Sequence, residues 1–329
     1  MKKTSLFRML ALALSFCLLL GAVSAAADTG WKPRGRTITI RVANAAGGQA
    51  DLIMRVVAKH VQEVTGVTTV VQNITGASGF MMATDLNSYD PSICELMLGT
   101  EALFAIAPLF NDKINISLDD YAVLYGSDSS TSPSTLAVPA RLGVKTWDEF
   151  VEYAKSNRIL AASNQPGGLT HMNATALFGA AGIEFTSVAD SGGNKNVLSC
   201  LNGDANCVIV NTSVLHDYAA TGELIPLVQF NSAPYTEWDL DPVPSVADIG
   251  FPEIVMESCN VMCCRKGVDQ ADVDALGKII VDYLRSEEGI QALAEINSTS
   301  RPLDADVAVA RLKHEVETTT RIYNTYYSK

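Results

Sequence analysis

The stretch TITIRVANAAGGQADLIMRVVAKHVQEV (residues 37–64) carries the signal that decides the fold. Its first part, 37–44, alternates apolar and polar side chains and is rich in β-branched residues, which predicts a β-strand. Gly47 and Gly48 interrupt this pattern. From Asp51 to Val64 the apolar residues recur with the period of a helix. A strand, a glycine turn and a helix therefore follow one another here.

The same pattern continues outward from this stretch. TTVVQN (68–73) predicts a second strand, TGASG (75–79) a turn before another helix, and LMLGT (96–100) a third strand. Strands that alternate with helices in this way are typical of a parallel sheet with right-handed crossovers.

A second set of strands and helices begins after the polar tract GSDSSTSPS (126–134). Its expected elements are a strand at 135–138, a helix at 147–156 capped by Thr146, and then segments at 159–163, 171–181, 185–189, 194–201 and 206–210. About 300 residues after a leader exceed one comfortable core, so we expect two lobes.

The chain is expected to cross between the lobes in the polar tract and to cross back near Pro252–Val255. Amphipathic helices at 268–296 and 304–327 would complete the first lobe. This assigns 28–133 plus 253–329 to lobe 1 and 134–252 to lobe 2.

The N-terminus has the pattern of a cleaved secretory signal, residues 1–27. Lys2, Lys3 and Arg8 precede an apolar run that ends at Val23, and small residues follow. A lipobox ending at Cys17 is the alternative, but Phe16 is too large for the position before a lipidated cysteine. No later stretch is apolar for long enough to cross a membrane. We therefore expect a soluble, monomeric periplasmic protein rather than a lipoprotein.

The chain is acidic, with a net charge of −12 that becomes −15 once the three cationic residues of the leader are removed. A chain with this charge repels nucleic acid and anionic lipid at long range, so neither is an expected partner.

Six cysteines follow the leader: Cys94, Cys200, Cys207, Cys259, Cys263 and Cys264. Cys200 and Cys207 flank the predicted turn LNGDAN and form the favoured disulfide candidate in an oxidising compartment. The last three cysteines could suggest zinc, but no histidine or second C-x-x-C lies near them. Another disulfide or buried thiols is the alternative, and no metal or cofactor is expected.

Three strand-to-helix turns are glycine-rich: Gly47-Gly48, Gly167-Gly168 and Gly192-Gly193. Such turns lie at the carboxyl edge of a parallel sheet, where ligands bind in open α/β folds. Glycine lets the backbone approach a ligand, and unpaired N–H groups at a helix start can hold an anion without arginine. Ordinary turns also carry glycine, but three of them over two lobes favour an anion site.

The order and spacing of these segments resemble the periplasmic solute-binding proteins of tripartite tricarboxylate transporters, the Bug family. Gly47, Gly48, Asp51 and Arg55 fit that family's strand, Pro-Phe-x-x-Gly-Gly-x-x-Asp turn and helix. Further segments are similar at 70–79, 99–108, 163–171, 188–227 and 244–253, so that the resemblance covers essentially the whole mature chain.

The resemblance implies a type II Venus-flytrap fold in which each lobe is a mostly parallel sheet flanked by helices. It implies a small di- or tricarboxylate, or an amino acid, bound between the lobes and delivered to membrane permease subunits. Asp51 would organise its turn rather than touch the anion. The implied ligand-binding residues are Asn44, Ala46, Gly47, Gly48, Asp51, Thr100, Glu101, Ser163, Asn164, Gly167, Gly168, Thr170, His171, Asp190, Ser191, Gly192, Asn211 and Cys259.

The chain departs from the family pattern at several of these positions. Gly168 replaces a threonine, for which Thr170 is a substitute, and Asp190-Ser191 replaces Tyr-Lys. Glu101 replaces a small residue. Glu101 and Asp190 are either solvated rim residues or partners of a ligand amino group, which would make the solute a zwitterion.

The sequence favours a binding protein over an enzyme. It has no G-x-S-x-G, H-E-x-x-H or P-loop motif. His171 is expected to hydrogen-bond the backbone near the cleft loop, with ligand contact second, and a Cys–His nucleophile would require it to lie near Cys259. A sensor for a signalling system and a secreted enzyme on the same scaffold remain the alternatives.

Overall fold

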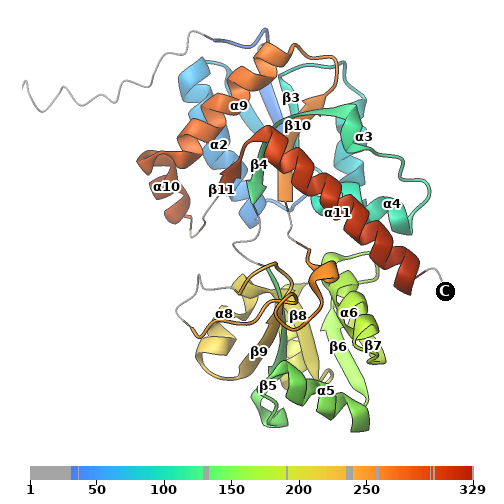
Figure 1. Ribbon diagram of the computed structural model, residues 1–329. Helices are drawn as coiled ribbons and strands as arrows, with labels where there is room; N and C mark the ends of the chain where they lie inside the picture. The colour runs from blue at the N-terminus through green and yellow to red at the C-terminus, as the bar shows by residue number, and fades with distance from the viewer. Residues whose placement is uncertain are drawn as a thin grey trace, which may run out of the picture.

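The computed structural model describes residues 31–35, 37–128, 133–189, 192–234, 240–256, 259–296, 298 and 301–327 (Figure 1). The expected signal peptide lies outside these residues. Within the described part of the chain, no helix has the length and apolar character needed to cross a membrane.

The described strands form two sheets. Sheet A has six strands in the order β11-β4-β10-β3-β1-β2. Its strands are β1 (Thr37–Val42), β2 (Thr68–Asn73), β3 (Glu95–Gly99), β4 (Tyr121–Asp128), β10 (Cys259–Arg265) and β11 (Arg301–Leu303). Sheet B has five strands in the order β7-β6-β8-β5-β9. These are β5 (Ser134–Pro139), β6 (Ile159–Ser163), β7 (Phe185–Ala189), β8 (Cys207–Asn211) and β9 (Leu224–Gln229).

The parallel pairing predicted from the strand–helix pattern holds for part of each sheet. β1 pairs in parallel with β2 and β3, and β6 pairs in parallel with β7 and β8. β10 and β5, the first strands after the chain passes from one sheet to the other, run antiparallel to their neighbours. Each sheet therefore contains the expected parallel strands and is mixed, because the strand that enters from the other sheet runs antiparallel to its neighbours.

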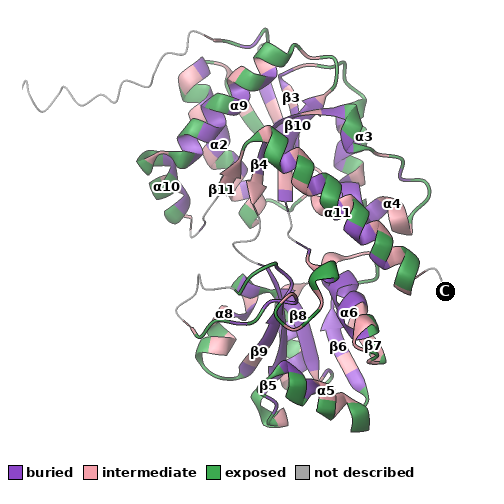
Figure 2. Ribbon diagram, viewed as in Figure 1, coloured by how far each residue is buried: buried purple, intermediate pink, exposed green. Residues whose placement is uncertain are grey.

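Helices cover both faces of each sheet, and successive side chains of a strand pack alternately against the helices on one face and on the other. In sheet A, Ile38, Ile40 and Val42 pack in one core cluster with α2 (Gln49–Thr65) and α9 (Gln270–Arg285). Met97 and Val261 belong to a second cluster that contains residues of α3 (Phe80–Asn87). Figure 2 shows the buried residues concentrated on the strands and on the inward faces of the helices.

Sheet B has the same arrangement. One cluster contains residues of α5 (Trp147–Ser156) and α6 (Leu169–Ala180). The other contains residues of α7 (Gly193–Asn202) and α8 (Thr212–Ala220).

Cys200 and Cys207 do not form the expected disulfide in the structure, because successive side chains of β8 point to opposite faces of the sheet. Cys207 packs in the α5/α6 cluster, whereas Cys200 of α7 packs in the α7/α8 cluster on the opposite face of the sheet. All six described cysteines are buried free thiols in this structure. The turn between Cys200 and Cys207 is short, but the two side chains point into different layers.

The segment predicted as one helix at 268–296 is two helices. α9 ends at Arg285, and α10 (Glu287–Ala294) follows directly. Ser286 has an extended ψ of 158°, and its hydroxyl accepts the Gly289 N–H at 3.1 Å, which caps α10. A Cβ at Gly289 would lie 2.0 Å from the Tyr283 carbonyl oxygen, so only glycine permits this corner.

The last helix, α11 (Ala305–Tyr326), packs against both sheet systems (Figure 1). Ala308 and Leu312 lie in the α3-side cluster of sheet A, and Ile322 lies in the α5/α6 cluster of sheet B. We expected 304–327 to complete the first lobe, but its C-terminal half contributes to the core of the second sheet system as well.

Candidate functional site

The glycine turns singled out in the sequence all end in helix N-termini. Gly48, Gly168 and Gly192 are the N-cap residues of α2, α6 and α7, and none of these helices has a side-chain cap. By contrast, Thr146, Asp269 and Ser286 cap α5, α9 and α10 with side-chain oxygens. Uncapped first-turn N–H groups keep their donor capacity and carry the positive end of the helix dipole.

Gly47 and Gly167 precede two of these N-caps and need the freedom of glycine. Their φ angles are 81° and 88°, in the region that L side chains rarely adopt. The two turns are thus built alike, one on each sheet.

Asp51 organises the first turn, as expected. Its side chain is 1% exposed, and both oxygens are occupied. Oδ2 accepts the Gly47 N–H at 2.9 Å and Arg55 Nε at 2.9 Å, while Oδ1 accepts Arg55 Nη2 at 2.8 Å and Asn73 Nδ2 at 2.9 Å. The hydrogen bond from Arg55 is the main cause that lowers the pKa of Asp51 to about 2. Asp51 is therefore a charged structural residue.

Asn73 was not among the predicted site residues. It is the last residue of β2, and its Nδ2 also donates to the Asn44 carbonyl oxygen at 2.9 Å. The amide thus holds the backbone at Asn44 in place. An asparagine at the end of a strand and before a glycine turn was the available signal.

The second turn of sheet A has an unusual backbone. Gly76, Ala77, Ser78 and Gly79 all have positive φ, at 128°, 46°, 53° and 93°. A Cβ at Gly79 would meet Cβ of Ala43 at 3.5 Å and Cβ of Leu103 at 3.6 Å. This turn therefore lies between the segments that follow β1 and β3, and it brings the three sheet A connections together.

Thr100 and Glu101 follow β3. Thr100 Oγ1 accepts the Leu103 N–H at 3.3 Å, and the chain then continues as a π-helical segment, η2 (Ala102–Ile106), before α4 (Ala107–Phe110). π-helical turns are frequent at functional sites. Glu101 is partly buried at the start of this segment.

The negative charge of Glu101 acts on the Cys259 thiol. Burial raises the pKa of the Cys259 thiol to about 12, with Glu101, Asp128 and Glu315 also raising it and Arg311 opposing them. The side chain is 0% exposed in a core cluster of sheet A. The neutral, protonated form of this buried thiol is therefore favoured, which is the form that is weak as a nucleophile.

The loop from Ser163 to Thr170 follows β6 and is held by its own hydrogen bonds. The Thr170 hydroxyl accepts the Asn164 N–H at 2.9 Å, and the Gln165 carbonyl accepts the Gly168 N–H at 2.9 Å. Ser163 is fully buried and its hydroxyl lies 3.3 Å from the Asn164 carbonyl. Thr170 therefore shapes the loop, and its N–H and that of Leu169 open α6.

His171 has a different partner from the one expected. Its Nδ1 lies 2.8 Å from the Tyr327 hydroxyl at the end of α11, rather than at the backbone of the loop. Burial lowers the pKa of the imidazole, so the neutral form is favoured.

The remaining predicted residues follow β7 and β8. Asp190 and Ser191 lie outside the described residues. Asn211 is exposed and is the N-cap residue of α8, whose start also lacks a side-chain cap. In the described ranges no group of three histidine, cysteine, aspartate or glutamate side chains is placed to hold a metal ion.

Solved structures show the same fold. A TctC solute-binding protein from Polaromonas, without ligand, has a TM-score of 0.76 at 20% identity, covering 88% of this chain and 99% of that chain. A Rhodopseudomonas palustris protein with adipate has a TM-score of 0.72 at 19% identity over 89% and 98% of the two chains. MatC from the same organism, with bound malate, has a TM-score of 0.67 at 19% identity over 88% and 99%.

Sequence relatives agree with this likeness. The chain is 25% identical over 269 residues to BugT of Bordetella pertussis (strain Tohama I), covering 80% of this chain and 81% of that protein. It is 26% identical over 246 residues to the UPF0065 protein in the gbd 5' region of Cupriavidus necator, covering 73% and 72%. The model of the tripartite tricarboxylate transporter family receptor matches residues 53–299, most of the chain. The protein therefore belongs to this family of transporter receptors and is one of its solute-binding proteins.

Proposed function

We propose that this protein binds a small organic carboxylate between two lobes and delivers it to the membrane subunits of a tripartite tricarboxylate-type permease. The observation that carries the proposal is the set of helix N-termini at Gly48, Gly168 and Gly192. They are built on both sheets, begin at glycine, and have no capping side chain. Such N-termini hold a carboxylate through backbone N–H groups.

The charges around the first turn support backbone rather than side-chain recognition. Arg55, the first cation after Gly47-Gly48 in the chain, is engaged by both oxygens of Asp51. The ligand would therefore meet dipoles instead of a free guanidinium. The related structures with malate and adipate show two dicarboxylates bound to proteins of this fold.

In this proposal, lobe 1 comprises 28–133 plus 253–329 and lobe 2 comprises 134–252. A ligand that contacts both lobes stabilises the closed conformation in proportion to its preference for that state. The protein acts outside the cytoplasm as a monomer, after removal of residues 1–27. It releases its ligand chemically unchanged, with no metal or cofactor.

An amino acid ligand is the second candidate, and Glu101 is the observation that favours it. This carboxylate stands one residue after Thr100, and its field reaches the buried Cys259 thiol, where Arg311, paired with Asp128 at 2.7 Å, opposes it. A ligand with an ammonium group would gain from such a field, while a plain dicarboxylate would not.

A thermal-shift screen of the mature protein tests the proposal. Succinate, malate, adipate, citrate, aspartate and glutamate would be tested, and each hit confirmed by titration calorimetry. At 100 times its dissociation constant a true ligand adds about 2.7 kcal/mol to the free energy of unfolding. Mass spectrometry of the recovered ligand separates a binder from an enzyme. Absence of any shift with all six compounds, or conversion of a ligand into product, would overturn the proposal.

A further inference from the structure

The Gly167 backbone lies directly against an aromatic ring of α4. A Cβ at Gly167 would stand 3.3 Å from Cγ and 3.5 Å from Cβ of Phe110. Phe110 is the last residue of α4, which follows β3 of sheet A, whereas Gly167 belongs to the loop after β6 of sheet B. The loop that presents the α6 N-terminus is thus in van der Waals contact with α4, whose Leu109 and Phe110 pack against the α5/α6 cluster.

Phe110 is itself held by the end of α11. Its ring meets Tyr323 edge-on at a centroid distance of 5.1 Å and Tyr327 edge-on at 5.0 Å. The two tyrosine rings stack on each other at 5.6 Å with an interplanar angle of 8°. Edge-to-face pairs of this kind are attractive beyond their buried area. We call Phe110, Tyr323 and Tyr327 the aromatic cluster.

The Tyr327 hydroxyl connects the aromatic cluster to α6 by hydrogen bonds. That hydroxyl lies 2.8 Å from His171 Nδ1 and donates to Thr175 Oγ1 at 2.9 Å. His171 and Thr175 lie one turn apart on α6, and His171 is only four residues after Gly167. The start of α6 is therefore fixed on both sides, by a ring against Gly167 and by a hydroxyl at His171.

We propose that Tyr327, acting through Phe110 and His171, is a positioning residue that fixes the Gly167–Thr170 turn for ligand binding. The ligand part of this inference rests on the proposed function, but the loop part does not. A loop held in its binding conformation loses less entropy when the ligand arrives, so its anchors contribute to affinity without touching the ligand.

Hydrogen exchange of the ligand-free protein tests the loop part. Tyr327→Phe keeps the ring and removes the hydroxyl, whereas Tyr323→Phe removes a hydroxyl that has no hydrogen bond to a described residue. Exchange in a peptide covering 163–171 should quicken about two- to tenfold in Tyr327→Phe, the range expected for one hydrogen bond, and stay at the wild-type rate in Tyr323→Phe. Equal exchange in the two variants and the wild type would overturn the inference.

Ligand affinity gives the second measurement, with malate and adipate as probes. The dissociation constant should rise about two- to tenfold in Tyr327→Phe and stay unchanged in Tyr323→Phe. His171→Asn, which retains a side-chain donor near the Nδ1 position, should bind like the wild type, while His171→Leu should resemble Tyr327→Phe. Loss of affinity in the asparagine and leucine variants alike would contradict a role through the Tyr327 hydroxyl. If the wild type binds neither probe, the proposed ligand class fails, and hydrogen exchange still decides the loop part.

Discussion

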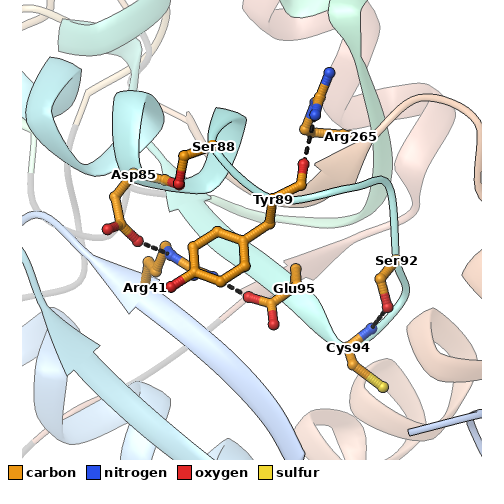
Figure 3. Close-up of polar contacts among 8 residues, drawn as sticks. All are labelled: Arg41, Asp85, Ser88, Tyr89, Ser92, Cys94, Glu95 and Arg265. Carbon is orange, nitrogen blue, oxygen red and sulfur yellow. Dashed lines mark hydrogen bonds and ion pairs between the residues drawn. The ribbon is translucent and has the colours of Figure 1, made fainter.

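Arg41 Nε donates to Asp85 Oδ2 at 2.6 Å in a position where the arginine side chain is only 1% exposed (Figure 3). Its Nη1 donates to Glu95 at 2.6 Å, and the Tyr89 ring lies 4.6 Å from its Cζ. The guanidinium on β1 is thereby joined to α3 and to β3. The segments that follow β1 and β3 and the turn that precedes α3 meet at the sheet A side of the candidate site.

Removing one carboxylate of this group should destabilise the protein. Asp85→Asn leaves the buried Arg41 charge with one anionic partner, and the expected loss in the free energy of unfolding is about 1–3 kcal/mol in urea denaturation. Glu63→Gln is the control, because the Lys59–Glu63 pair is exposed and 4.0 Å apart. It should change stability by less than about 0.5 kcal/mol. Similar losses in both variants would contradict the assignment of a buried ionic group.

Local sequence patterns predicted the strands before Gly47 and Gly167 and the helices after them, because period and glycine act over a few residues. Asp51 was placed correctly for the same reason, since its partners Gly47 and Arg55 are four residues away on either side. The disulfide prediction was wrong because the sheet face of Cys207 depends on the register of β8 with its neighbours. Tyr327 gave no local signal, since its partners Phe110 and His171 are distant in sequence.

Asp51 should make the stability of the protein depend on acid. Its pKa of about 2 lies below its ordinary value, so the folded state releases this proton more readily than the unfolded chain. The resulting stabilisation is present above pH ~4 and is lost as the pH falls toward 2, with an amplitude of about 1–2 kcal/mol after allowance for the half-exposed Arg55.

Urea midpoints measured between pH 5 and pH 2 for the wild type and Asp51→Asn test this prediction. The variant should be less stable at pH 5 and should converge on the wild type in acid. Asp282→Asn, in an exposed pair with Lys278, is the control. A constant offset between wild type and Asp51→Asn at every pH would contradict the ionic role of Asp51.

Ser78→Gly should stabilise the protein. Ser78 has a φ of 53°, and a non-glycine residue in this region costs of order 1 kcal/mol. Glycine removes that cost but gains freedom in the unfolded chain, so the expected net gain is about 0.5 kcal/mol. Ser88→Gly is the matched control, because Ser88 has a φ of −77° and its hydroxyl donates to the Asp85 carbonyl. Thermal denaturation should therefore show opposite signs for the two changes, and a loss of stability in both would refute the strain argument.

Burial of His171 should make the protein less stable in mild acid. Because the pKa of the buried imidazole is lowered, the unfolded chain binds a proton below pH ~6.5 while the folded protein resists it. The free energy of unfolding should thus decrease from pH 7.5 to pH 5.5, and the decrease should be smaller in His171→Asn, which cannot titrate. His60 is partly buried, also has a lowered pKa and remains in both proteins, so it cancels in the comparison. Equal pH dependence of the two would place the acid sensitivity elsewhere.

Glu101→Gln distinguishes the two ligand classes. If Glu101 pairs with a ligand ammonium group, this change should weaken aspartate and glutamate binding about tenfold, the effect of losing one charged hydrogen bond, and leave succinate unchanged. Glu152→Gln, on the exposed face of α5, is the control for net charge. Because both changes remove one negative charge, a uniform gain in anion affinity would appear in both and would reflect the general field of this acidic chain. Only a selective loss for the amino acids in Glu101→Gln supports the ammonium contact, whereas tight succinate binding with no amino acid binding in the wild type rules it out.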